Sequence, residues 1–146
     1  MKNNKKKLQE KLWKLCCEYI RLRDKNTCQW CGKRVEGSNA HTSHVIPKSH
    51  GNALRYDENN LKLLCFHCHL MRWHLHPLEA DLWFQKCFPE RYEYLMNFKE
   101  KTLKLTPSLI EEMINDYKFK ILNLNKKENM YDGIDNYFKA HLKEKQ

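Results

Sequence analysis

Apolar residues recur three or four positions apart along most of this 146-residue chain, with polar residues between them. This spacing is typical of amphipathic helices, and over residues 5–23 it predicts a helix whose other face carries Lys and Arg. The same pattern predicts further helices over residues 78–87, 89–100, 107–124 and 131–143. The third of these begins with the cap Thr106 followed by Pro107.

The middle of the chain has a different pattern. Residues 41–46 and 60–64 are short and β-favouring, so we expect two strands there, the first ended by Pro47. The polar loop 48–59 is long enough to indicate a function, and residues 66–76 have helical spacing. The sequence thus predicts a mostly helical α+β protein with strand, long loop, strand and helix at its centre.

We expect one domain in three parts: a basic amphipathic N-terminal helix within residues 1–27, a central unit over 28–76, and a helical region over 77–146 for packing or dimerisation. The net charge of +9 comes mostly from the first 40 residues. This excess predicts a polyanionic partner, nucleic acid or an anionic membrane surface, with solubility alone as the other explanation.

No run of about 18 apolar residues is present, so we expect no membrane-spanning segment. The first residues are basic but lack the apolar stretch of a secretory signal. We therefore expect a cytoplasmic protein, in a reducing compartment that disfavours disulfides.

Four of the seven cysteines form two matched pairs, Cys28-x2-Cys31 and Cys65-x2-Cys68. Thiolates at this repeated spacing are typical ligands of a structural Zn²⁺ ion, with two unrelated pairs of buried cysteines as the alternative. The remaining three fit small buried hydrophobic positions; they are Cys16, Cys17 and Cys87.

Six of the eight histidines lie within residues 41–76 outside the long loop, and a neutral imidazole can act as metal ligand or general base. Their context, Ser43-His44-Val45-Ile46-Pro47, then Asn60-Leu61, then Cys65-x2-Cys68-His69, resembles the HNH nuclease motif, a ββα-metal finger. The outer cysteine pairs resemble the zinc-stapled subset of that family. Residues 54–57, 76–80 and 88–92 further resemble phage recombination endonucleases of the NinG/Rap type.

The resemblance implies a role for each motif residue. His44 would be the general base that takes a proton from water. The Asn60 amide would bond backbone across the loop and hold the two strands. His69 would hold one catalytic divalent ion, Mg²⁺ or Mn²⁺, at the start of the helix.

One position departs from the pattern of the family. Many members carry Asp or His directly before the base as a second ligand of the ion, whereas this chain has Ser43, a poor ligand. His41 is the first candidate to replace it, because on a strand it shares a face with Ser43. His74 is the second, although on a regular α-helix it would lie about 140° from His69.

Other residues have expected places around this site. Arg72 would stabilise negative charge in the transition state or position phosphate, and Trp73 would pack in the core. His50, His67 and His141 are expected at the surface. The basic residues expected to contact DNA are Lys5, Lys6, Lys7, Lys11, Lys14, Arg21, Arg23, Lys48 and Arg55.

The resemblance therefore implies a metal-dependent DNA endonuclease with one structural zinc. Its NinG/Rap-like part implies branched recombination intermediates, D-loops or Holliday junctions, as substrates and a homodimer as the cutting form. Two alternatives stay open: a restriction- or homing-type HNH nuclease or nickase on duplex DNA, and an inactive zinc-containing DNA-binding module whose metal site has decayed at Ser43.

Overall fold

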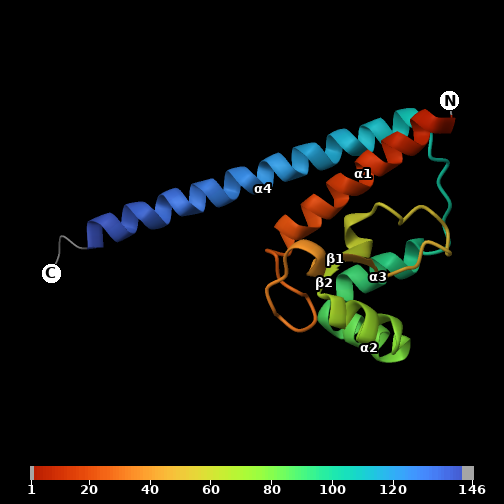
Figure 1. The fold of residues 1–146 in the computed structure, drawn as a ribbon, viewed down its shortest axis with the longest axis horizontal. Coiled ribbons are helices and arrows are strands. Elements are labelled where there is room, and N and C mark those ends of the chain that lie inside the picture. Colours follow the sequence, from red (N-terminus) through yellow and green to blue (C-terminus); the bar gives the residue numbers. More distant parts are fainter. Residues whose placement is uncertain (1, 143–146) are drawn as a thin grey trace.

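The computed structural model describes the backbone of residues 2–142 and the side chains of residues 3–132 (Figure 1). Its elements are, in order, α1 (Lys2–Arg23), β1 (His41–His44), β2 (Leu61–Leu64), a π-helix (Cys68–His74), α2 (Pro77–Cys87), α3 (Pro89–Phe98) and α4 (Pro107–Leu142). Single 3-10 turns lie at Gly37–Asn39 and Glu58–Asn60. The predicted fold class is confirmed: a mostly helical chain surrounds one two-stranded antiparallel sheet.

Helices α1 and α4 lie side by side and run in the same direction, covering one side of the sheet (Figure 1). Their contact buries Leu12, Cys16 and Ile20 of α1 against an apolar stripe of α4. That stripe consists of Ile110, Ile114, Tyr117 and Ile121. Burial of these side chains is the main force that holds α1 on the rest of the molecule.

Helix α4 is longer than predicted. It continues without a break where the sequence predicted two helices, because residues 125–130 contain no Pro or Gly to end it. Its start agrees with the prediction, since the Leu109 N–H donates to the Thr106 Oγ1 at 3.2 Å. The apolar face predicted within residues 131–143, and His141, lie outside the described side chains.

The end of α1 is fastened to β2. Lys25 and Asn26 have positive φ angles of 53° and 49°, which ends the helix. Asp24 then accepts a hydrogen bond from the Leu63 N–H at 2.9 Å, and Arg23 donates to the carbonyls of Glu58 and Leu61 at 2.6 and 2.7 Å. The Arg23 guanidinium, expected to contact DNA, is thus bound to the protein's own backbone and remains partly exposed.

The long loop after β1 is fixed in place rather than free. Asn52 exchanges two hydrogen bonds with the backbone of Leu103, both 2.7 Å, and Gly51 lies against Lys101 so closely that a Cβ would be 2.4 Å from its carbonyl oxygen. A second small core of Leu54, Phe84 and Leu95 lies under the loop. These contacts hold the loop against the rest of the protein beside the end of β1.

Candidate functional site

The two cysteine pairs meet as predicted. The Sγ atoms of all four residues, Cys28, Cys31, Cys65 and Cys68, lie within 4.8 Å of one another. A tetrahedral Zn²⁺ ion with Zn–S distances of about 2.3 Å requires sulfurs about 3.8 Å apart, and Cys31 and Cys65 are 3.9 Å apart. The cluster therefore fits a structural zinc.

The other three cysteines are not alike. Cys16 is buried as predicted, and Cys17 is half-buried. Cys87, expected to be buried, is exposed because it is the last residue of α2 and lies on its solvent side.

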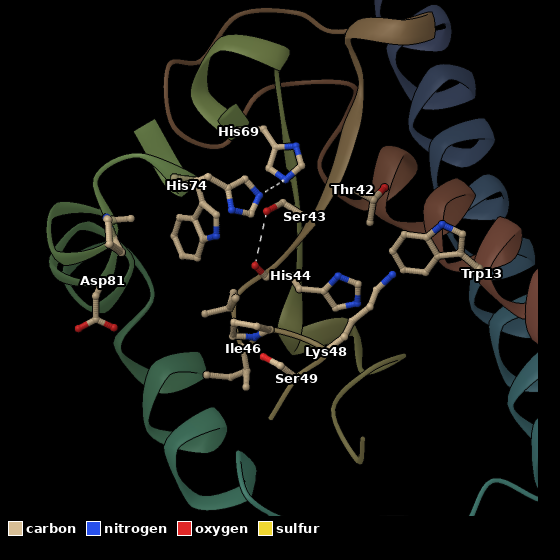
Figure 2. A pocket seen from close by; sticks show the side chains of 15 residues that line it. Trp13, Thr42, Ser43, His44, Ile46, Lys48, Ser49, His69, His74 and Asp81 are labelled. Carbon is tan, nitrogen blue, oxygen red and sulfur yellow. Dashed lines mark hydrogen bonds between the residues drawn. The ribbon is translucent and has the colours of Figure 1, made fainter. Parts of the chain in front are cut away.

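A pocket of about 730 Å³ lies at His44 and His69 (Figure 2). It is lined by β1 and the following turn, by His69, Trp73 and His74 of the π-helix, by the first part of α2, and by Trp13 from α1. Among its described lining residues Asp81 is the single acidic one, and Figure 2 shows its carboxylate turned away from the histidines. The donor atoms that the pocket offers to an ion are therefore imidazole nitrogens.

His44 stands at the end of β1 with its ring held on two sides. The ring stacks on Trp13 with centroids 5.2 Å apart and an interplanar angle of 7°. Its Nε2 lies 3.0 Å from the carbonyl oxygen of Arg55. A carbonyl only accepts, so Nε2 carries the proton, and the neutral ring keeps a lone pair on Nδ1.

The surroundings also keep His44 neutral. Burial lowers the pKa of His44 to about 4, and the positive charges of Lys48, Lys62 and Arg55 act in the same direction. At pH 7 the imidazole is therefore the free base that can accept a proton.

Asn60 has the bonding that the sequence analysis expects of its amide. It is buried, its Oδ1 accepts from the Ile46 N–H at 2.6 Å, and its Nδ2 donates to the carbonyls of Ile46 and Leu54 at 3.1 and 3.0 Å. These bonds continue the strand pairing where the backbone ladder ends, after the Val45 N–H bonds the Asn60 carbonyl. For this reason the observed strands β1 and β2 are shorter than the predicted ranges 41–46 and 60–64.

His69 lies between two other histidines. Its Nδ1 is 2.9 Å from Nδ1 of His41, and its Nε2 is 3.0 Å from Nε2 of His74 (Figure 2). The expectation that His74 is too far away holds only for an α-helix. Residues Cys68–His74 form a π-helix, whose larger turn places residues five apart on one face.

The hydrogen bonds of these three rings indicate which nitrogen of each ring carries the proton. Nε2 of His41 lies 2.9 Å from the Ser38 carbonyl and must donate to it, so neutral His41 accepts at Nδ1. His69 must then donate from Nδ1, which leaves the lone pair of its Nε2 facing His74. Burial, with the charges of neighbouring groups, lowers the pKa of His69 to about 4, so this lone pair is free at pH 7.

This order of protons gives His41 and His74 different positions around His69. An ion at Nε2 of His69 would have His74 as its second ligand. His41 would bond the far nitrogen of His69 and orient its ring, as partners of metal-bound histidines commonly do. His41 thus lies beside the site as expected, but the geometry favours His74 as the ligand.

Arg72 lies away from the pocket. Its guanidinium is 5.6 Å from the centre of the Trp30 ring, which itself stacks on Trp83 at 4.4 Å. In a π-helix the third residue after His69 points to another side, so the resemblance in spacing does not bring Arg72 to the histidines. His50 and His67 are exposed as expected, and Trp73 packs against both cores.

Basic residues line this pocket and two others that share Trp13 with it. Lys48 lines it and also lines a neighbouring pocket of about 320 Å³ together with Lys6, Trp13 and Arg55. Lys14 and Arg21 line a third pocket on the other side of Trp13. Lys7 and Lys11 are exposed and Lys5 is half-exposed on α1, in none of these pockets.

Three contributors to the site were missed from the sequence: the Trp13 ring, the Arg55 carbonyl and Lys62, which lies behind Ser43. Trp13 could have been found as the aromatic residue on the basic face of a helix. Lys62 could have been found as a charge inside the apolar run Leu61–Leu64. The Arg55 carbonyl gives no signal in the sequence, because backbone atoms are common to all residues.

Comparison with known proteins adds one finding. The model of the HNH endonuclease family matches residues 28–73, which is less than half of the chain. Neither the curated proteins nor the solved structures gave a significant match. No helix in the described part of the chain is long and apolar enough to cross a membrane. The matched segment holds both cysteine pairs, His44, Asn60 and His69, and it suggests a nuclease of the HNH family.

Proposed function

We propose that the protein is a metal-dependent DNA endonuclease that hydrolyses phosphodiester bonds in the pocket beside the zinc cluster. The observation that carries this proposal is the pair of oriented imidazoles, both neutral at pH 7: His44, whose Nδ1 is free, and His69, whose Nε2 faces His74. Both line the same pocket.

His44 acts as the general base. Its Nδ1 takes a proton from the attacking water, while the Arg55 carbonyl and the Trp13 ring keep the imidazole in one tautomer and one plane. Asn60 does not touch substrate; it holds the turn after β1 and thereby the position of the base.

His69 and His74 are the residues that would hold the catalytic ion, with His41 orienting His69 from behind. When bound, such an ion stabilises charge on the scissile phosphate and on the leaving oxygen. The donor set suits a divalent ion, because Nε2 of His69 and Nε2 of His74 lie 3.0 Å apart and imidazole nitrogens are common ligands of such ions.

DNA would lie across the basic mouth of the pocket. Lys6, Lys48 and Arg55 lie on one side of Trp13, and Lys14 and Arg21 lie on the other. These side chains suit contacts with phosphates, which fix the position of the duplex without reading its sequence. We also expect Lys5, Lys7 and Lys11 to add to this attraction.

The finer proposal is that the substrate is branched DNA and that a homodimer cuts it. It rests on the likeness of residues 54–57, 76–80 and 88–92 to phage recombination endonucleases of the NinG/Rap type. A dimer would supply the two pockets that are needed to cut two strands.

The test uses zinc-loaded protein on a four-way junction, a D-loop and a linear duplex of shared sequence, each with Mn²⁺, with Mg²⁺ and without added ion. We expect ion-dependent cleavage, and preferential cleavage of the branched substrates. His44→Ala should lose cleavage by about 10²–10⁴-fold and keep its DNA affinity and zinc content, because proton removal matters only in the transition state.

Other outcomes would point elsewhere. Equal cleavage of the linear duplex would favour a restriction- or homing-type nuclease or nickase. Binding without cleavage by any ion would identify an inactive DNA-binding module. Full activity of His44→Ala would remove the proposed base.

A further inference from the structure

Lys62 is the most unusual charged residue of the described chain. It lies in the middle of β2 and has no exposed surface. Among the described residues no carboxylate forms an ion pair with it, whereas Arg23 and Lys120 both have such partners. A buried cation that forms no ion pair is costly even with the attraction of Asp24, so its place in this strand points to a function.

The Lys62 amino group has three acceptors around it. Its Nζ donates to Oγ of Ser43 at 3.2 Å and to the carbonyl of His44 at 3.3 Å, and it lies 3.2 Å from the centre of the Trp73 ring. An ammonium has three N–H groups, so each finds an acceptor. Burial lowers the pKa of Lys62 and the charge of Arg91 acts in the same direction, while the carboxylate of Asp24 opposes the shift.

These contacts place the Lys62 amino group next to Ser43 and the backbone of the base His44. Lys62 pairs with Ser43 across the two strands, and Ser43 precedes the base His44. Figure 2 shows the Ser43 side chain on the side of His69 and His74. The positive charge of Lys62 also contributes to the lowered pKa values of both His44 and His69.

Two consequences for an ion follow from this placement. Ser43 cannot offer its hydroxyl freely, because that oxygen already accepts from Lys62. The Lys62 amino group thus lies at Ser43, the strand position directly before the base. Mg²⁺ prefers oxygen ligands, while later divalent ions of the first transition row accept imidazole readily.

We propose that Lys62 determines the metal specificity of the site: with Ser43 it excludes a ligand from β1, so that the pocket takes an imidazole-preferring ion such as Ni²⁺ or Co²⁺ rather than Mg²⁺. This proposal rests on the proposed function, since it concerns the ion of the same pocket. Lys62 is here a positioning residue, because its burial keeps it from touching the substrate.

The experiment is a cycle of four zinc-loaded proteins: the wild type, Ser43→Asp, Lys62→Met and the double variant. Binding of Ni²⁺ and of Mg²⁺ is measured by calorimetry without DNA, so that the readout does not depend on activity. The wild type should bind Ni²⁺ at least tenfold more tightly than Mg²⁺. Ser43→Asp alone should gain little for Mg²⁺, because the new carboxylate pairs with Lys62.

The double variant should gain at least tenfold in Mg²⁺ affinity, more than the two single changes together. That coupling is a readout that a merely structural role of Lys62 would not produce. Lys120→Met is the matched control, since Lys120 lies on α4 and binds Glu58 and Asp116. It should leave both affinities unchanged.

Three results would overturn the proposal: equal binding of Mg²⁺ and Ni²⁺ by the wild type, a full gain for Mg²⁺ in Ser43→Asp alone, or no gain in the double variant. If Lys62→Met does not fold, judged by zinc content and circular dichroism, Lys62→Gln replaces it, because an amide still donates two hydrogen bonds without charge. A failure of the proposed function is distinguishable: His69→Ala would then leave Ni²⁺ binding unchanged in the wild-type background.

Discussion

At the scale of the residue, the site depends on how single imidazoles are held. His44 and His69 both have a pKa lowered to about 4, mainly by burial. The Arg55 carbonyl binds Nε2 of His44 and leaves its Nδ1 as the reactive atom, whereas His69 has a histidine at each ring nitrogen, His41 at Nδ1 and His74 at Nε2. The orientation of each imidazole thus depends on a hydrogen bond to a backbone carbonyl or to another histidine.

Trp13 should control the titration of His44. Trp13→Ala exposes the ring, so we expect the pKa of His44 to rise from about 4 toward the ordinary value of about 6.5, while Trp13→Phe keeps it low. The measurement is an NMR titration of the imidazole in zinc-loaded protein. An unchanged midpoint in Trp13→Ala would show that α1 does not shield the base.

The lowered pKa of His44 also makes the stability of the protein depend on pH in a defined direction. Because the folded state holds His44 neutral, the unfolded chain binds the proton more readily between about pH 6.5 and pH 4. The contribution of His44 to the free energy of unfolding is therefore complete above about pH 6.5 and is lost as the pH falls toward 4. Trp13→Ala should flatten this part of the pH–stability curve.

Asn60 should matter more for stability than a surface amide. Asn60→Ala removes three hydrogen bonds and leaves the Ile46 N–H without its acceptor, so we expect a loss of about 2–4 kcal/mol in the free energy of unfolding. Urea denaturation gives this value. Asn59→Ala is the control, since the structure gives that neighbouring side chain no hydrogen bond, and a loss of similar size there would contradict the assignment.

At the scale of the element, part of the molecule could be predicted from sequence and part could not. The cysteine pairs, the two strands and the helix α1 follow from local spacing. The π-helix could not be predicted, because local propensity does not separate it from an α-helix. The roles of Arg23 and Lys62 depend on strand register and on contacts between distant segments, which the sequence pattern does not reveal.

The zinc cluster joins two such distant segments, so its loss should unfold the centre of the molecule. We expect Cys28→Ser to lower the free energy of unfolding by about 4 kcal/mol or more and to lower zinc content below one ion per chain. Cys87→Ser is the matched control, because Cys87 is exposed and outside the cluster. Wild-type stability in a zinc-free Cys28→Ser protein would show that the cluster has no structural role.

At the scale of the whole molecule, the family match and the site do not coincide. The family match covers residues 28–73, yet Trp13 from α1 and His74 also line the pocket. The basic residues around the mouth come from α1 and from the loop after β1. The N-terminal helix is therefore part of the proposed catalytic unit.

The salt dependence of DNA binding tests this surface. Replacing Lys6, Lys48 and Arg55 by Gln should flatten the plot of log affinity against log salt by about 2–3, since each phosphate contact contributes about 0.9 to the slope. Lys118→Gln, an exposed change on α4 outside these pockets, should leave the slope almost unchanged. Equal slopes for the triple variant and the wild type would place the DNA elsewhere.

The π-helix has a consequence for how the histidine pair tolerates changes in chain length. A π turn contains about one residue more than an α turn, so the segment Cys68–His74 behaves as an α-helix that carries one inserted residue. Removing one residue between His69 and His74 would leave two histidines four apart, which share a face of an α-helix. Adding one residue would separate them. The ligand pair is thus robust to a deletion and sensitive to an insertion.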